Sequence, residues 1–234
     1  MTELGAKQSQ QAGKELRDIL DASNKKRVHF VVSPLRRALQ TAQGILSQIM
    51  DPTDDDDNDA LVKVTVHPAA AEVLRDPCDI GSPVAQLETE FPNFDWELVR
   101  QHAAASQGVW WGRRQYDVAE SWRRMREGLP DGVETDEQVE ERLQTLRQYI
   151  CNLSTADLVV VVCHSETIWY LSSLRGGDGD LYGIWTKNGE IVDLTQRILR
   201  PSEDPTEASS QSSSGESGGC DLDNRYQPFE VFLT

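Results

Sequence analysis

Apolar residues are grouped along this chain in two ways, which predict buried strands and amphipathic helices. Residues 27–32 and 158–162 are mostly apolar runs without strict alternation, as expected for strands covered on both faces of a sheet. Four further elements are expected from the spacing of apolar residues: helices over 2–23, 36–49 and 135–152, and a short strand over 61–66. This order of strands and helices predicts an α/β protein with a mostly parallel sheet.

Three segments differ from the rest of a main domain predicted over 1–199. Residues 51–59 (DPTDDDDND) carry so many like charges that a solvated loop is expected rather than a cation site. Residues 200–224 are rich in Ser, Gly and acidic residues, so burial cannot offset their ordering entropy and we expect disorder. Residues 225–234 carry alternating apolar side chains, which predicts a terminal strand able to pair back onto the sheet.

Composition and charge narrow the class of protein. With 234 residues, a net charge of -16 and a pI near 4.6, the chain is unsuited to nucleic acids or anionic membranes, because both are polyanions. It has no apolar run of about 18 residues and no basic N-terminal region followed by an apolar stretch, so a soluble cytoplasmic protein is expected. Its cysteines lack the paired spacing of zinc ligands, and no metal or cofactor is predicted.

The two buried strand patterns each lead through a polar residue into a helix. In 31–42 (VVSPLRRALQTA) the strand ends at Ser33 and the helix carries Arg37, and in 158–171 (LVVVVCHSETIWYL) the strand ends at His164. Strand ends gather on one rim of a parallel sheet beside helix N-termini, so an arginine and a histidine there suggest a phosphoryl-binding site. Taken singly, Arg37 also fits an exposed helix residue, and His164 fits a buried, hydrogen-bonded histidine.

With these motifs the chain resembles the histidine phosphatases, or phosphoglycerate-mutase-like superfamily, in a fungal and plant branch. The second arginine of SPLRRALQTA, Arg37, matches the family's phosphate-binding arginine. The stretch HPAAAEVLRDPCDIGSP at 67–83 is similar to the branch's His-Pro-x-Leu-x-Glu and Pro-Cys-Asp-x-Gly-Ser motifs and places Glu72 on the proton donor. His164 matches the second catalytic histidine, although Cys-His-Ser replaces the commoner Ser-His-Gly and two alanines replace larger residues before Glu72.

The family's first motif, a strand that ends in Arg-His-Gly and carries the phosphorylated histidine, is not found in this sequence. The chain opens at 1–5 with MTELG, which is similar to the helix start that follows that strand in the family. The resemblance covers most of 1–199 and implies a three-layer α/β/α phosphoglycerate-mutase-like fold whose first central strand is missing. Inner strand edges would then stay open, so we expect poor folding, or association that increases with salt.

The reaction implied by the resemblance is metal-independent hydrolysis of a phosphomonoester through a phosphohistidine intermediate. The histidine of the missing motif would attack phosphorus, Glu72 would protonate the departing alkoxide, and Arg37 and His164 would hold the phosphoryl oxygens. Water would then cleave the phosphohistidine with Glu72 as the base. The substrate is expected to be a phosphorylated small molecule or a phosphoprotein.

Three interpretations of the chain follow. The favoured one is a phosphatase whose Arg-His-Gly segment is missing from this sequence, so that the chain as given is inactive. The second is a pseudo-phosphatase that binds a phosphorylated ligand or protein through Arg37 and His164 without turnover. The third is an interaction protein that contacts its partner through its acidic tail and the aromatic segment at 91–122. The resemblance implies that this aromatic segment covers the site, and a helical side layer is the plainer alternative.

Overall fold

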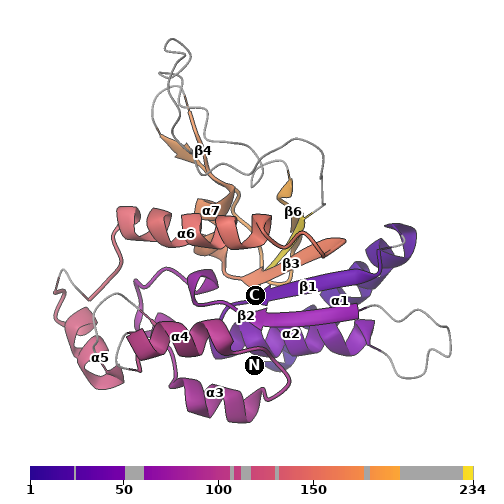
Figure 1. The fold of residues 1–234 in the computed structure, drawn as a ribbon. Coiled ribbons are helices and arrows are strands. Elements are labelled where there is room, and N and C mark those ends of the chain that lie inside the picture. Colours follow the sequence, from indigo (N-terminus) through magenta and orange to yellow (C-terminus); the bar gives the residue numbers. More distant parts are fainter. Residues whose placement is uncertain are drawn as a thin grey trace.

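The computed structural model contains a five-stranded sheet with helices on both faces (Figure 1). It describes residues 1–23, 25–50, 61–105, 108–111, 117–129, 132–176, 180–195 and 229–233. The strand order is β2-β1-β3-β7-β6, in which four strands are parallel and β6 is antiparallel. These strands are β1 (Arg27–Val32), β2 (Leu61–Val66), β3 (Leu158–Cys163), β6 (Ile191–Asp193) and β7 (Phe229–Leu233). A separate small sheet pairs β4 (Leu174–Arg175) with β5 (Leu181–Tyr182).

The three helices predicted by residue range are present, and the described residues form four further helices. The helices are α1 (Glu3–Ser23), α2 (Arg36–Ile49), α3 (Val84–Glu90), α4 (Glu97–Ala105), α5 (Val118–Arg126), α6 (Asp136–Cys151) and α7 (Ser165–Ser172), with short 3-10 turns η1 (Pro68–Ala70) and η2 (Pro77–Asp79) after β2. The predicted α1, α2 and α6 agree to within one residue at each end, and β1, β2 and β3 are also confirmed. The α/β class is therefore confirmed. No helix in the described part of the chain combines the length and apolarity needed to cross a membrane.

The central strands β1 and β3 separate two hydrophobic cores. One core contains Phe30 and Val160 together with residues of α1 and α2. The other contains Val31 and Val161 together with residues of α6 and α7. Because helices cover both faces, these strands need no polar side, which explains the unbroken apolar runs in the sequence.

Helices α1 and α2 lie against each other on one face of the sheet. Gly44 of α2 faces Ser9 of α1, and a Cβ at Gly44 would collide with the Ser9 hydroxyl group. The missing side chain therefore permits the close approach of the two helices. This packing fixes the direction of α2, whose first turn carries Arg37.

The C-terminal segment changes the expected arrangement of the sheet. Residues 229–233 form the predicted terminal strand, which pairs in parallel with β3, from Val159↔Phe229 to Cys163↔Leu233, and antiparallel with β6. The expectation that β3 would have an open edge is therefore wrong, because β7 supplies the hydrogen-bonding partner that an inner strand requires. The predicted association through that edge loses its structural basis.

Some predictions lie partly or wholly outside the described residues. The acidic loop at 51–59 and the Ser/Gly-rich stretch at 200–224 belong to this group. In the described part of the aromatic segment, Trp96, Trp110 and Trp111 are buried in the core that includes α1 and α2. These buried rings fit the plainer interpretation of a helical side layer.

Candidate functional site

The ends of three parallel strands bring the predicted site residues to one rim of the sheet. Ser33 follows β1 and donates its backbone N–H to the carbonyl oxygen of Val162 in β3 at 2.9 Å. His67 follows β2 and donates its N–H to the carbonyl oxygen of Val32 at 2.9 Å. His164 comes directly after β3, at the N-cap of α7. The rim geometry inferred from the two strand-to-helix patterns is thus present.

Arg37 and His164 contact each other at this rim. The Nε of Arg37 donates a hydrogen bond to Nδ1 of His164 at 3.2 Å, and Nε2 of His164 lies 2.8 Å from the Ser33 hydroxyl oxygen. Because a guanidinium group can only donate, Nδ1 must be unprotonated. The neutral ring therefore carries its proton on Nε2 and donates it to Ser33. Burial lowers the pKa of His164 well below 6.5, and the positive charges of Arg37 and Arg142 lower it further.

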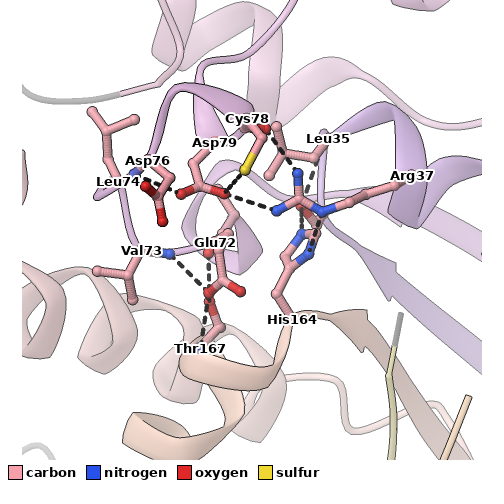
Figure 2. A network of polar contacts seen from close by, with 12 residues as sticks. Leu35, Arg37, Glu72, Val73, Leu74, Asp76, Cys78, Asp79, His164 and Thr167 are labelled. Carbon is pink, nitrogen blue, oxygen red and sulfur yellow. Dashed lines mark hydrogen bonds and ion pairs between the residues drawn. The ribbon is translucent and has the colours of Figure 1, made fainter. Parts of the chain in front are cut away.

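The other donors of Arg37 are held by the segment that contains η2. Arg37 donates to the carbonyl oxygen of Cys78 at 2.8 Å and to Oδ1 of Asp79 at 3.0 Å (Figure 2). The second carboxylate oxygen of Asp79 accepts the backbone N–H of Asp76 at 3.0 Å. The neighbouring arginine, Arg36, instead pairs with Glu90 at 2.7 and 2.9 Å. Of the two consecutive arginines, the structure therefore places only Arg37 beside His164.

Glu72 lies close to these residues with its two carboxylate oxygens in different surroundings. Oε1 accepts hydrogen bonds from the backbone N–H groups of Val73 at 2.9 Å and Thr167 at 3.1 Å, and from the Thr167 hydroxyl at 3.1 Å. Figure 2 shows the other oxygen turned toward the side of His164. Burial raises the pKa of Glu72, although the donors on Val73 and Thr167 oppose this shift. The carboxyl group is thus oriented at one oxygen and available for proton transfer at the other.

Two structural supports fix the loops that carry Glu72 and Asp79. Arg142 of α6 donates to the carbonyl oxygens of Ala69 and Ala71 at 2.8 and 2.9 Å and is neutralised by Glu134. Gly81 packs so closely against Trp110 and Trp111 that a Cβ would collide with either ring. The buried aromatic residues therefore hold the chain just after Asp79 in place.

A second ionic network adjoins the site through α7. Arg75 contacts Glu166 at 2.9 Å and also donates to Asp136 at 2.9 Å and to the Tyr170 hydroxyl oxygen at 2.8 Å. The Tyr170 hydroxyl donates in turn to Asp136 at 2.7 Å. Burial raises the pKa of Glu166, Arg75 opposes this shift, and the negative charges of Glu72 and Asp79 add to it. The charged residues at the rim therefore include this network as well as Glu72.

The remaining histidines of the chain lie in another cluster. His29 contacts the Thr65 hydroxyl at 2.9 Å, and the His67 ring lies 4.6 Å from the Tyr149 ring, measured between centroids. Burial lowers the pKa of His67 to about 4, and the positive charge of His102 lowers it further. The described residues contain no group of three or more His, Cys, Asp or Glu side chains arranged for a metal ion.

Sequence reasoning identified Arg37, Glu72 and His164, and the structure brings all three together. It missed three residues that complete their hydrogen bonds, namely Ser33, Asp79 and Thr167. Each of the three lies inside or next to a motif already singled out in the sequence. The sequence therefore contained these residues within recognised motifs, but it did not show which distant residues they would bond to.

No family model matches the chain, and no curated protein matches it. The resemblance to the histidine phosphatases therefore stays a prediction from the sequence motifs.

Proposed function

We propose that the rim site formed by Ser33, Arg37, Glu72, Asp79 and His164 binds the phosphoryl group of a phosphomonoester. The observation that carries the proposal is the direct contact between Arg37 and a neutral His164 at the carboxyl ends of parallel strands. Arg37 has five N–H groups, and its hydrogen bonds to described residues use three of them. The other two N–H groups are available to phosphoryl oxygens.

The same geometry supports binding without turnover for this chain. A nucleophilic histidine needs a free, unprotonated ring nitrogen that faces phosphorus. In His164, Nε2 carries the proton toward Ser33, and Nδ1 accepts a hydrogen bond from Arg37. The other histidines contact Thr65 and Tyr149 or lie near them. A pseudo-phosphatase is therefore the function that these contacts favour for the chain as given.

Hydrolysis stays a proposal for a longer product that also carries an Arg-His-Gly strand. The histidine of that strand would form the bond to phosphorus, and the leaving alkoxide would take its proton from Glu72. Water would then attack the phosphohistidine, give its proton to Glu72 and release inorganic phosphate. The raised pKa of Glu72 supports this role, because an acid must be protonated near the working pH. A further strand beside β3 would have to displace β1 or β7, since both edges of β3 are paired.

Phosphate titration of paired arginine variants tests the proposal. Arg37→Ala should weaken the binding of inorganic phosphate at least tenfold, because its guanidinium supplies the charged hydrogen bonds. Arg36→Ala is the matched control and should bind phosphate like the parent protein, since Arg36 pairs with Glu90. Binding can be followed by calorimetry and by the NMR shifts of the His164 ring. Equal phosphate affinity in the two variants, or none in the parent, would overturn the proposal.

A turnover assay separates the two candidate functions. This chain should not hydrolyse an aryl phosphate, whereas a version extended upstream with an Arg-His-Gly strand should do so without added metal. Equal rates from the two proteins would contradict the assignment of the nucleophile. Loss of the extended protein's activity on addition of a chelator would contradict the metal-independent scheme.

A further inference from the structure

The surroundings of the rim site contain more acidic than basic groups. Arg37 is in direct contact with Asp79, and the guanidinium of Arg142 is neutralised by Glu134. Among the described residues, the other carboxyl groups near the site belong to Glu72, Asp76, Asp136 and Glu166, and the other guanidinium groups to Arg75 and Arg147. Together with the net charge of -16, this balance disfavours a ligand that brings negative charge alone.

The acidic groups beyond Glu72 are fixed and accessible. Arg75 holds Glu166 and Asp136 from one side, at 2.9 Å in both cases. The side chain of Asp136 is 69 % exposed and that of Glu166 is 27 % exposed. One guanidinium therefore positions two carboxylates and leaves one negative charge uncompensated at the edge of the site.

Aromatic rings continue this surface along α7. Tyr170, which contacts both Arg75 and Asp136, also packs edge-on against Trp169 with ring centroids 4.9 Å apart. Trp169 lies 5.9 Å from Trp185, which is 66 % exposed. Tyr182 of β5 is 55 % exposed. Exposed aromatic faces next to carboxylates attract lysine and arginine side chains through charge and cation–π contacts.

We propose that the rim site takes a phosphorylated protein segment with lysine or arginine residues beside the phosphorylated residue. This inference rests on the proposed phosphoryl-binding function. Arg37 and His164 would hold the phosphoryl group, while the basic side chains would contact Glu166, Asp136 and the exposed ring of Trp185. A sugar phosphate or nucleotide lacks the positive charge that this surface requires. The series of contacts from Arg75 through Tyr170 and Trp169 to the exposed Trp185 favours an extended peptide over a small phosphorylated amine.

Binding of matched peptides to the full chain tests the inference. One peptide carries phosphoserine flanked by arginine and lysine, and a second carries the same phosphoserine flanked by glutamate. The basic phosphopeptide should bind roughly three- to tenfold more tightly at low salt, and the difference should shrink as salt screens the charges. Equal affinity of the two peptides at low salt would overturn the inference while leaving the proposed function intact.

Two further ligands test whether binding needs both the phosphoryl group and the peptide chain around it. The unphosphorylated basic peptide should bind at least tenfold more weakly than its phosphorylated form, since it cannot engage Arg37. Phosphoethanolamine should also bind more weakly than the basic phosphopeptide, because it cannot reach the aromatic rings. If the unphosphorylated peptide or phosphoethanolamine binds as tightly, a phosphorylated protein segment is not the ligand.

Variants distinguish a failure of this inference from a failure of the proposed function. Glu166→Gln should lower the affinity for the basic phosphopeptide roughly two- to fivefold and leave that for inorganic phosphate no weaker. Glu90→Gln, which removes an acid paired with Arg36, is the control and should change neither. Arg37→Ala should weaken both ligands. Unchanged peptide binding in Glu166→Gln would reject the acidic surface, whereas unchanged binding in Arg37→Ala would reject the phosphoryl site itself.

Discussion

Two groups of buried histidines in this protein share a lowered pKa but have different partners. His164 is 1 % exposed and lies between the charged Arg37 and the Ser33 hydroxyl. His29 and His67 are each 6 % exposed and have a threonine hydroxyl, a backbone N–H and a phenol ring as neighbours. Burial is the largest cause of the lowered pKa in all three.

The comparison shows that burial and a low pKa do not by themselves indicate a functional histidine. The hydrogen-bond partners make the difference, because the rings of the second cluster bond to a neutral hydroxyl and a backbone N–H, whereas His164 bonds to a charged guanidinium. At His164 the partner is a guanidinium that keeps free N–H groups at a sheet rim. The second cluster is therefore expected to matter for stability, and His164 for binding.

The largest expected effect is a loss of folding stability at acidic pH, caused by the protonation of His29 and His67. The pKa of each is lowered from 6.5 to about 4, so the unfolded chain takes up protons first as the pH falls. Stability should be fully present above pH 6.5 and decrease toward pH 4, by at most about 3 kcal/mol for each histidine. Protonation of His67 would also break the hydrogen bond that Nδ1 accepts from Ala69. Urea unfolding between pH 4 and 7 measures the slope, to which the lowered pKa of His164 also contributes.

NMR titration of the imidazole protons provides the control for that experiment. Lys63 lowers the pKa of His29 further, and Asp95 opposes it, so removing Lys63 should raise this value. A stability curve that stays flat from pH 7 to pH 4, or ring pKa values near 6.5, would contradict the explanation by burial.

A smaller effect is expected when single histidines from the two groups are replaced. His164→Ala should weaken phosphate binding roughly tenfold or more, because Arg37 loses the ring that orients its guanidinium. His29→Ala should leave phosphate affinity unchanged and lower the free energy of unfolding by about 1–3 kcal/mol through the lost contact to Thr65. Calorimetric titration and denaturant unfolding on both variants give the two readouts. The contrast fails if His29→Ala also weakens phosphate binding in a folded protein.

The smallest expected effect concerns the charge of Glu72. Sulfate is fully ionised between pH 5 and 8, so any change in its affinity reports the protein. Because burial raises the pKa of Glu72, sulfate should bind more tightly at the acidic end, where the carboxyl group is protonated, and weaken as the pH rises. Glu72→Gln should bind sulfate a few times more tightly at pH 8 and show a flatter pH profile. An unchanged profile would mean that Glu72 does not face the anion.

The strongly patterned elements of the fold could be predicted from the sequence. Strands β1 and β3 are buried on both faces, and their apolar runs carry that information locally. The alternation in 229–233 identified a strand but not its place, since a period of two does not specify which edge the strand joins. The position of this strand between β3 and β6 depends on which strand edges of the sheet are still unpaired when it joins.

The site was predictable only in part for a similar reason. Arg37, Glu72 and His164 stand in motifs with a recognisable family pattern. Ser33, Asp79 and Thr167 act through partners that are 131, 42 and 95 residues away in the chain. Hydroxyl and carboxyl groups are common in loops, so their roles become visible only when the fold brings these distant positions together.

The place of β7 has a consequence for how the protein is made. Phe229 comes 66 residues after Cys163, so at synthesis rates of 5–20 residues per second β3 waits roughly 3–13 s for its second neighbour. During this interval the valine-rich edge of β3 is exposed in the nascent chain. Such an edge is a target for chaperones and for other unfinished chains. The central strand of the sheet is thus synthesised well before the strand that protects it.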